Sequence, residues 1–178
     1  MDIITVEKRE NGAKAKQLRR AGIVPCCVYG GALPDSLSLQ MDLGTAEKIF
    51  REKREGSKVK LKVGEEIIPA QIKELSRNIV NNDIIHLSFQ GLKADQKVNS
   101  VAHVFLKNMD KVPGMLERML MEIPFASLPK DMIDTVTVDL EDMPVGTIIT
   151  VKDIPEFLDE NIELQVDKES IVLRIHEQ

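Results

Sequence analysis

The sequence predicts a mainly β protein with a few short helices, an α+β fold, and three observations support this. Short β-branched, apolar runs separated by turn residues recur along the chain, as is typical of strands. Few segments favour helix by propensity, and those are short. Hydrophobic residues make up 43% of the 178 residues and charged residues 30%, which suffices for a packed core and excludes a disordered chain.

The first half is predicted to hold two helices among several strands. One helix spans residues 13–20 and ends at Gly22, and a second spans 46–55, with Thr45 as its cap and Gly56 as its stop. Ile49 and Phe50 are expected to face the core. The predicted strands span residues 3–8, 23–29, 37–41, 58–63, 67–75 and 84–89.

The second half is predicted to be a sandwich or barrel of short strands. The segment 115–128 fits both a helical face and a strand alternation, and periodicity leaves the choice open. The polar, glycine-bearing segment 91–97 marks a domain boundary, which gives domains at residues 1–91 and 92–178. The predicted strands here span residues 98–106, 136–140, 147–151, 162–166 and 170–175.

Charge is divided unevenly along the chain. The net charge is −5, yet residues 1–90 hold 15 Lys and Arg against 12 Asp and Glu, and the remainder holds 9 against 17. Any nucleic acid is therefore expected to bind the first half. Residues 8–20 carry six cations and one acid, which fits phosphate binding, of structured RNA in particular, or a solvated helix face.

Signatures of catalysis and metal binding are missing from the sequence. His86, His103 and His176 are scattered, and no nucleophile, zinc or phosphate-loop motif occurs. Cys26 and Cys27 are adjacent, so a strand would point them to opposite faces and we expect no disulfide. We expect no enzyme activity, cofactor or bound metal. Without a signal peptide or membrane-length apolar run, we expect a soluble, cytosolic protein.

Two blocks of sequence resemble the family of bacterial large-subunit ribosomal protein number twenty-five and the general stress protein Ctc. They are KQLRRAGIVPCCVYGG and IKELSRNIVNNDIIHLSFQ, and residues from 97 onward resemble the second domain of the two-domain members. The resemblance implies a six-stranded β-barrel with helices that binds 5S rRNA, followed by an acidic, mostly β domain. It implies no enzyme activity and no cofactor, and a cytoplasmic, ribosome-associated protein. We expect a monomer off the ribosome, and the negative charge of the second domain favours contact with protein, such as large-subunit proteins, or with solvent.

The resemblance carries RNA contact over to Arg19, Tyr29 and His86, and the cations near them are expected as phosphate neighbours. The family pattern H-x-D-F has Ser88 in place of the aspartate, and a glutamine common before the turn is Ser76. Serine cannot offer a base amine the charged acceptor that aspartate offers. The alternative function is therefore a stress-linked relative with weakened 5S rRNA binding that acts mainly as a protein-interaction module. The candidate RNA-binding residues are Arg9, Lys14, Lys16, Arg19, Arg20, Tyr29, Arg77, His86 and Ser88.

Overall fold

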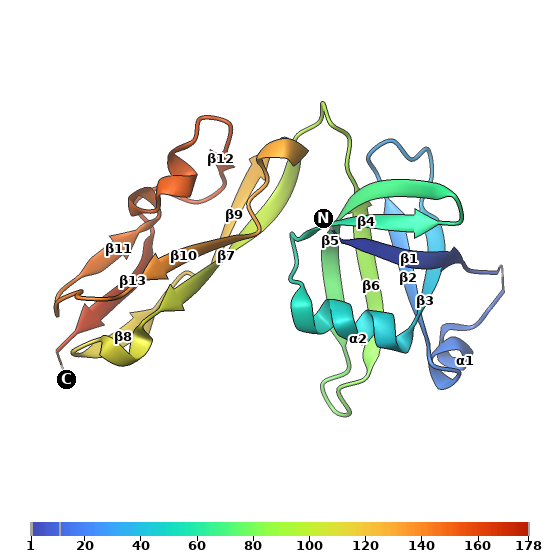
Figure 1. Cartoon of the computed structure of the whole chain (residues 1–178), viewed down its shortest axis with the longest axis horizontal. Coiled ribbons are helices and arrows are strands. Elements are labelled where there is room, and N and C mark those ends of the chain that lie inside the picture. Colours follow the sequence, from blue (N-terminus) through green and yellow to red (C-terminus); the bar gives the residue numbers. More distant parts are fainter. Residues whose placement is uncertain (1, 11, 178) are drawn as a thin grey trace. The chain divides into compact units, whose positions relative to one another are not determined.

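The computed structural model describes residues 2–10 and 12–177 (Figure 1). The chain separates into two compact units, residues 1–96 and 97–178, and the division falls inside the polar segment 91–97. Each unit has its own hydrophobic core. Across the described residues, no helix has the length and apolar character needed to cross a membrane.

The first unit is a closed six-stranded barrel with strand order β1-β3-β2-β6-β5-β4, so the predicted barrel is confirmed. The barrel closes where β1 pairs in parallel with β4, from Ile3 opposite Lys60 to Val6 opposite Val63. β2 also pairs in parallel with β6, and the other neighbours are antiparallel. The strands are β1 Ile3–Lys8, β2 Ile23–Tyr29, β3 Leu37–Asp42, β4 Lys58–Val63, β5 Glu66–Arg77 and β6 Ile84–Gly91.

Alternation along each strand fills the barrel with aliphatic side chains. In β6, Leu87 and Phe89 are fully buried, while Val28 of β2 and Leu39 of β3 meet them in the same core. Burying a side chain of this size contributes about 1.5–3 kcal/mol, so these residues dominate the stability of the unit. The side chains on the other face of the same strands are thereby directed outward.

Two helices accompany the barrel, α1 (Ala15–Arg20) and α2 (Leu43–Glu52). The expected start of the first helix at residue 13 was two residues early, because Lys14 is extended and occupies the cap position. The expected span of the second, 46–55, was also wrong. Its cap is Asp42, whose carboxylate accepts hydrogen bonds from the backbone N and the hydroxyl of Thr45, at 2.8 and 2.6 Å. Ile49 is buried as expected, and Phe50 is half-buried.

The second unit consists of a four-stranded sheet, β10-β7-β9-β12, and a three-stranded sheet, β11-β13-β8. The ambiguous segment 115–128 contains two strands, because the backbone breaks at Met119 and Leu120, whose amides both donate to the Val172 carbonyl. The core of the second unit includes Phe125 and Phe157, whose ring centroids are 6.3 Å apart. The strands are β7 Val98–Lys107, β8 Met115–Arg118, β9 Glu122–Ser127, β10 Thr135–Asp139, β11 Ile148–Thr150, β12 Glu163–Leu164 and β13 Ile171–His176. Short 3-10 turns are η1 Met109–Lys111, η2 Pro129–Asp131, η3 Val151–Asp153 and η4 Pro155–Leu158.

Candidate nucleic-acid interface

The basic segment predicted from the sequence lies on and around α1. The side chains of Lys14, Lys16, Arg19 and Arg20 are exposed, and none of the helix residues is buried. Arg19 and Arg20 occupy the last turn, where the negative end of the helix dipole stabilises cations. No residue of this six-residue helix is fully buried and Leu18 is only half-buried, so polar contacts add to its attachment.

Arg19 supplies one of these contacts. Its Nε donates a hydrogen bond of 3.0 Å to the backbone carbonyl of Ile85 in β6, which ties the helix to the barrel. That bond uses Nε, and the two terminal nitrogens of a guanidinium carry further N–H donors that can form a fork on phosphate. Arg19 is therefore held against the barrel through Nε, while its two terminal nitrogens can still donate hydrogen bonds to an anion.

A row of polar side chains runs across the outer face of the barrel beside this helix. The parallel pairing of β2 with β6 sets Cys27 opposite Ser88 and Tyr29 opposite Gln90. Since Leu87 and Phe89 point into the core, His86 and its alternate neighbours point outward. The sequence blocks that carry Tyr29 and His86, more than fifty residues apart, are therefore joined on one surface.

The candidate side chains on this surface differ in accessibility. Tyr29 is 37% exposed and His86 is half-buried, whereas Ser88 is only 7% exposed beneath its neighbours. A ligand can reach the Tyr29 ring directly but reaches the Ser88 hydroxyl only by close approach. Cys26 points inward and Cys27 is half-exposed on the row, both as free thiols, which confirms the prediction from alternation.

Glu74, an acid that was not predicted as a site residue, lies at the centre of this surface. It is exposed and lies opposite Ser88 in the pairing of β5 with β6. Burial, the Cys27 thiol and the Glu74 carboxylate together raise the pKa of Tyr29 above its usual value. A carboxylate repels phosphate, but it accepts hydrogen bonds from base amino groups. A strand prediction without the register between β5 and β6 gives no signal for this position.

The pKa of His86 is shifted by the burial of its ring and by the charged groups around it. Burial lowers its pKa most, the Glu74 carboxylate opposes that shift, and the cations Arg19 and Arg9 lower the pKa further. Arg9 and Arg19 therefore lie close enough to the imidazole to affect its pKa, although Arg9 directly follows β1. The structure thus brings Arg9, Arg19, Tyr29, His86 and Ser88 into one neighbourhood.

Arg77, by contrast, is engaged in packing. Its guanidinium carbon lies 4.4 Å from the centroid of the Phe50 ring, and its Nη1 donates to the Asn82 carbonyl at 3.3 Å. A small cavity of about 160 Å³ includes both Arg77 and Arg19 in its lining. Arg77 therefore supports the base of the β5–β6 hairpin and lies next to the candidate surface. Its guanidinium already interacts with the Phe50 ring and the Asn82 carbonyl.

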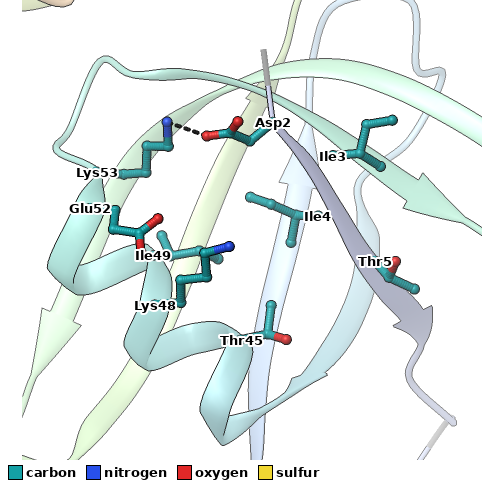
Figure 2. Close-up of a pocket in the computed structure, with 9 residues that line it drawn as sticks. All are labelled: Asp2, Ile3, Ile4, Thr5, Thr45, Lys48, Ile49, Glu52 and Lys53. Atoms are coloured by element: carbon teal, nitrogen blue, oxygen red, sulfur yellow. Dashed lines mark ion pairs between the residues drawn. The ribbon is translucent and has the colours of Figure 1, made fainter.

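An open groove of about 590 Å³ extends the surface from α1 to the β5–β6 hairpin. Lys16, Arg19 and Arg20 line one side, and Asn78, Asn81 and Asp83 belong to the other, so the groove holds three cations and one carboxylate. A different cavity, of about 210 Å³, lies between β1 and α2 beside the Asp2–Lys53 ion pair of 2.5 Å (Figure 2). None of the nine predicted RNA-binding residues lines it. In the described part of the chain, no group of three or more His, Cys, Asp or Glu side chains is placed to hold a metal ion.

Fold and surface together define a two-domain β protein whose first domain is a closed barrel with one basic helix on its outer face. Residues 4–89 match the Ribosomal L25p family, and residues 97–178 match the family described as Ribosomal protein TL5, C-terminal domain. The chain belongs to the family of large ribosomal subunit protein bL25.

Three relatives named large ribosomal subunit protein bL25 illustrate the extent of the similarity. The protein of Caldanaerobacter subterraneus subsp. tengcongensis is 26% identical over 181 residues, covering 98% of this chain and 90% of the relative. That of Caldicellulosiruptor saccharolyticus is 27% identical over 175 residues, covering 96% and 85%. That of Pseudomonas fluorescens is 31% identical over 147 residues, covering 80% and 73%. The similarity therefore includes both domains.

Proposed function

We propose that this protein is a cytoplasmic component of the large ribosomal subunit and that its first domain binds 5S rRNA through α1 and the outer faces of β2 and β6. The observation that carries the proposal is the hydrogen bond from Arg19 to the Ile85 carbonyl, which holds the basic helix beside the row of Tyr29 and His86. Membership of a family of ribosomal proteins supports the location and a binding role without catalysis.

Each side chain has a role that fits its position. Arg19 forks onto a phosphate, while Lys16 and Arg20 neutralise phosphates along the same groove. Tyr29 packs its ring on a ribose or donates its hydroxyl, and His86, held neutral by its lowered pKa, hydrogen-bonds a ribose hydroxyl or a base edge. RNA offers 2′-hydroxyls as hydrogen-bond partners for Tyr29 and His86, and DNA lacks these groups.

The remaining candidates contribute less direct contact. Lys14 and Arg9 flank the helix and act as phosphate neighbours, and Arg77 steadies the hairpin through Phe50. The Ser88 hydroxyl bonds a 2′-hydroxyl or base edge only where the RNA fits closely, because the side chain is 7% exposed. The acidic second domain repels phosphate and contacts protein instead, and the chain is a monomer off the ribosome.

The proposal is tested by binding of the purified chain to bacterial 5S rRNA and to a control hairpin at about physiological salt. Arg19→Ala should weaken 5S rRNA binding by about tenfold or more, since a charge-assisted hydrogen bond contributes roughly 1.5–3 kcal/mol. Arg19→Lys keeps the charge but loses the fork and should recover only part of the affinity. Arg51→Ala, which removes an exposed arginine of α2 outside this groove, is the matched control and should bind normally.

Salt dependence separates the two functions considered. Binding through phosphates should weaken steeply with salt, and Arg19→Ala should reduce the slope of log affinity against log salt by about one contact. Equal, weak binding of 5S rRNA and hairpin by the unaltered chain contradicts the proposal. It would favour instead a protein-interaction module, for which the buried, uncharged Ser88 is the supporting observation.

A further inference from the structure

The β5–β6 hairpin presents two apolar side chains to solvent at its tip. Ile79 is 101% exposed and Val80 is 95% exposed, well above the next value among the large apolar residues of the described chain, 64% at Leu158. Aliphatic side chains in water forgo the stabilisation that burial provides, and an adjacent pair at a loop tip is a feature that a binding role explains.

Hydrogen bonds within the turn shape the backbone of the tip, and both side chains point into solvent. The Asn78 side-chain oxygen accepts from the Val80 amide at 2.9 Å, and the Asn82 amide donates to the Asn78 carbonyl at 2.8 Å. Asn82 adopts the left-handed conformation, with φ of 59°, which asparagine tolerates. Since the polar groups of the turn bond to one another, the backbone that carries Ile79 and Val80 adopts a defined turn with both side chains outward.

The groove beside the tip indicates what kind of partner meets it. Asn78, Asn81 and Asp83 of the hairpin line the same groove as Lys16, Arg19 and Arg20 of α1. The one carboxylate, that of Asp83, accepts a hydrogen bond from the Asn81 side chain at 2.6 Å, so the three cations leave the groove an excess of positive charge. A partner that satisfies these cations carries negative charge, and one that also covers the tip presents an apolar face next to that charge. RNA combines both, because ribose and base faces lie a few ångströms from its phosphates and its minor groove is wide and shallow.

We infer that Ile79 and Val80 form an apolar wedge that packs against a ribose or an unstacked base in the minor groove of the RNA bound along α1. This rests on the proposed function and deepens it by adding a contact that carries no charge. Aliphatic side chains are used in this way by proteins that press into a minor groove and partly unstack its bases. The wedge extends the interface beyond the basic helix to the far end of the groove.

The first test uses the double variant Ile79→Ser/Val80→Ser in the full chain, with bacterial 5S rRNA as the probe. Losing this apolar contact should weaken binding by about tenfold, because burial of one such side chain is worth at least a factor of ten. The salt slope should not change, since no phosphate contact is lost. Ile67→Ser removes a 49% exposed isoleucine at the other end of β5 and should bind as the unaltered chain does.

A second measurement reports the contact itself. The chain has no tryptophan, so Val80→Trp introduces a single indole at the tip and Ile67→Trp a single indole at the control position. On addition of 5S rRNA, quenching of the Val80→Trp fluorescence by acrylamide should fall several-fold as the ring becomes covered. Quenching of Ile67→Trp should stay unchanged.

The outcomes distinguish this inference from the proposed function. If the unaltered chain binds 5S rRNA and Arg19→Ala loses it, while Ile79→Ser/Val80→Ser binds normally, the wedge is overturned and the proposed function stands. If the double variant binds 5S rRNA normally but no longer cosediments with large subunits, the tip contacts a protein and the inference is likewise overturned. If the unaltered chain fails to discriminate 5S rRNA from the hairpin, both fall.

Discussion

The imidazole of His86 is the most informative single group on the candidate surface, because its surroundings pull its pKa in opposite directions. Burial and the cations Arg19 and Arg9 favour the neutral ring, while the Glu74 carboxylate favours the charged one, and the net shift is downward. A neutral histidine can both donate and accept a hydrogen bond, whereas a protonated ring can only donate. The balance therefore decides which groups of an RNA it can recognise.

This balance predicts how stability changes with pH. The unfolded chain takes up a proton at His86 near pH 6.5, above the folded pKa, so its stabilising contribution is present above pH 6.5 and is lost as pH falls through the folded pKa. Urea unfolding between pH 7.5 and 5.5 should therefore show a larger loss of the free energy of unfolding in the unaltered chain than in His86→Gln. A smaller loss than in His86→Gln would mean that attraction to Glu74 outweighs burial.

Single positions were predictable from sequence where strand alternation or charge decides the matter. Alternation predicted that Cys26 and Cys27 face opposite sides of the strand, and the structure shows which one is inside, because Cys26 is buried and Cys27 is half-buried. Burial raises the pKa of the Cys26 thiol to about 12. The exposure of the cations on α1 agrees with their clustering in the sequence. The burial of Ser88 and the placement of Glu74 depend on how strands pair, which one sequence does not reveal.

At the scale of elements, the turn that follows β2 comes so close to the end of β6 that no side chain fits between the two backbones. A Cβ atom added to Gly31 would lie 2.6 Å from the carbonyl carbon of Gly91, and one added to Gly91 would lie 2.6 Å from the Gly30 carbonyl oxygen. Contacts this short against backbone cannot be relieved by turning a side chain. Glycine is therefore required where the strand that carries Tyr29 passes the end of β6.

We accordingly expect Gly91→Ala to lower the free energy of unfolding by about 1–3 kcal/mol, because the strands must separate to admit the methyl group. Urea unfolding measures this. Gly64→Ala is the comparison, since that residue has φ of 61° but nothing within 4 Å of an added Cβ, and its cost of about 1–2 kcal/mol is conformational. An unchanged free energy of unfolding in Gly91→Ala would show that the backbones of Gly30 and Gly91 can separate without cost.

Strands were predicted more accurately than helices, and the reason is local. β1 and β2 each begin at the first residue of an apolar, β-branched run, and both span the predicted residues, 3–8 and 23–29. The predicted start of α2 failed because β3 runs directly into the helix, and Asp42 serves as the last strand residue and as the cap. The segment 115–128 stayed open because the break at Met119 depends on a carbonyl fifty residues away.

For the whole molecule, the opposite charges of the two halves have a direct consequence. Each unit has its own core, and the excess of cations lies in the first. A fragment of residues 1–96 should therefore fold and bind 5S rRNA within about twofold of the full chain, while residues 97–178 should not bind, as like charges repel. Thermal unfolding followed by binding measures both. A fragment that folds but loses most of the affinity would assign rRNA contacts to the second domain.

The full set of residues at the candidate site, and their proximity to one another, could not be predicted from one sequence. The basic segment and the blocks around Tyr29 and His86 were visible as residues, but their proximity follows from the parallel pairing of β2 with β6. The tip at Ile79 and Val80 carried no signal, because two apolar residues between strands are ordinarily taken as part of a core. Solvent exposure alone distinguishes them.

The parallel pairing that closes the barrel also constrains the order in which the chain can fold during its synthesis. β1 is made first, yet its partners are residues 39–40 of β3 and residues 60–63 of β4, and β2 waits for β6. Both strands can pair early with β3, but β1 lacks its second partner until β4 is made, and β2 lacks its second partner until about half of the polypeptide has been translated. The surface that joins Tyr29 to His86 is completed by the last strand of the domain, so a nascent chain acquires it all at once, after β6 has left the exit tunnel.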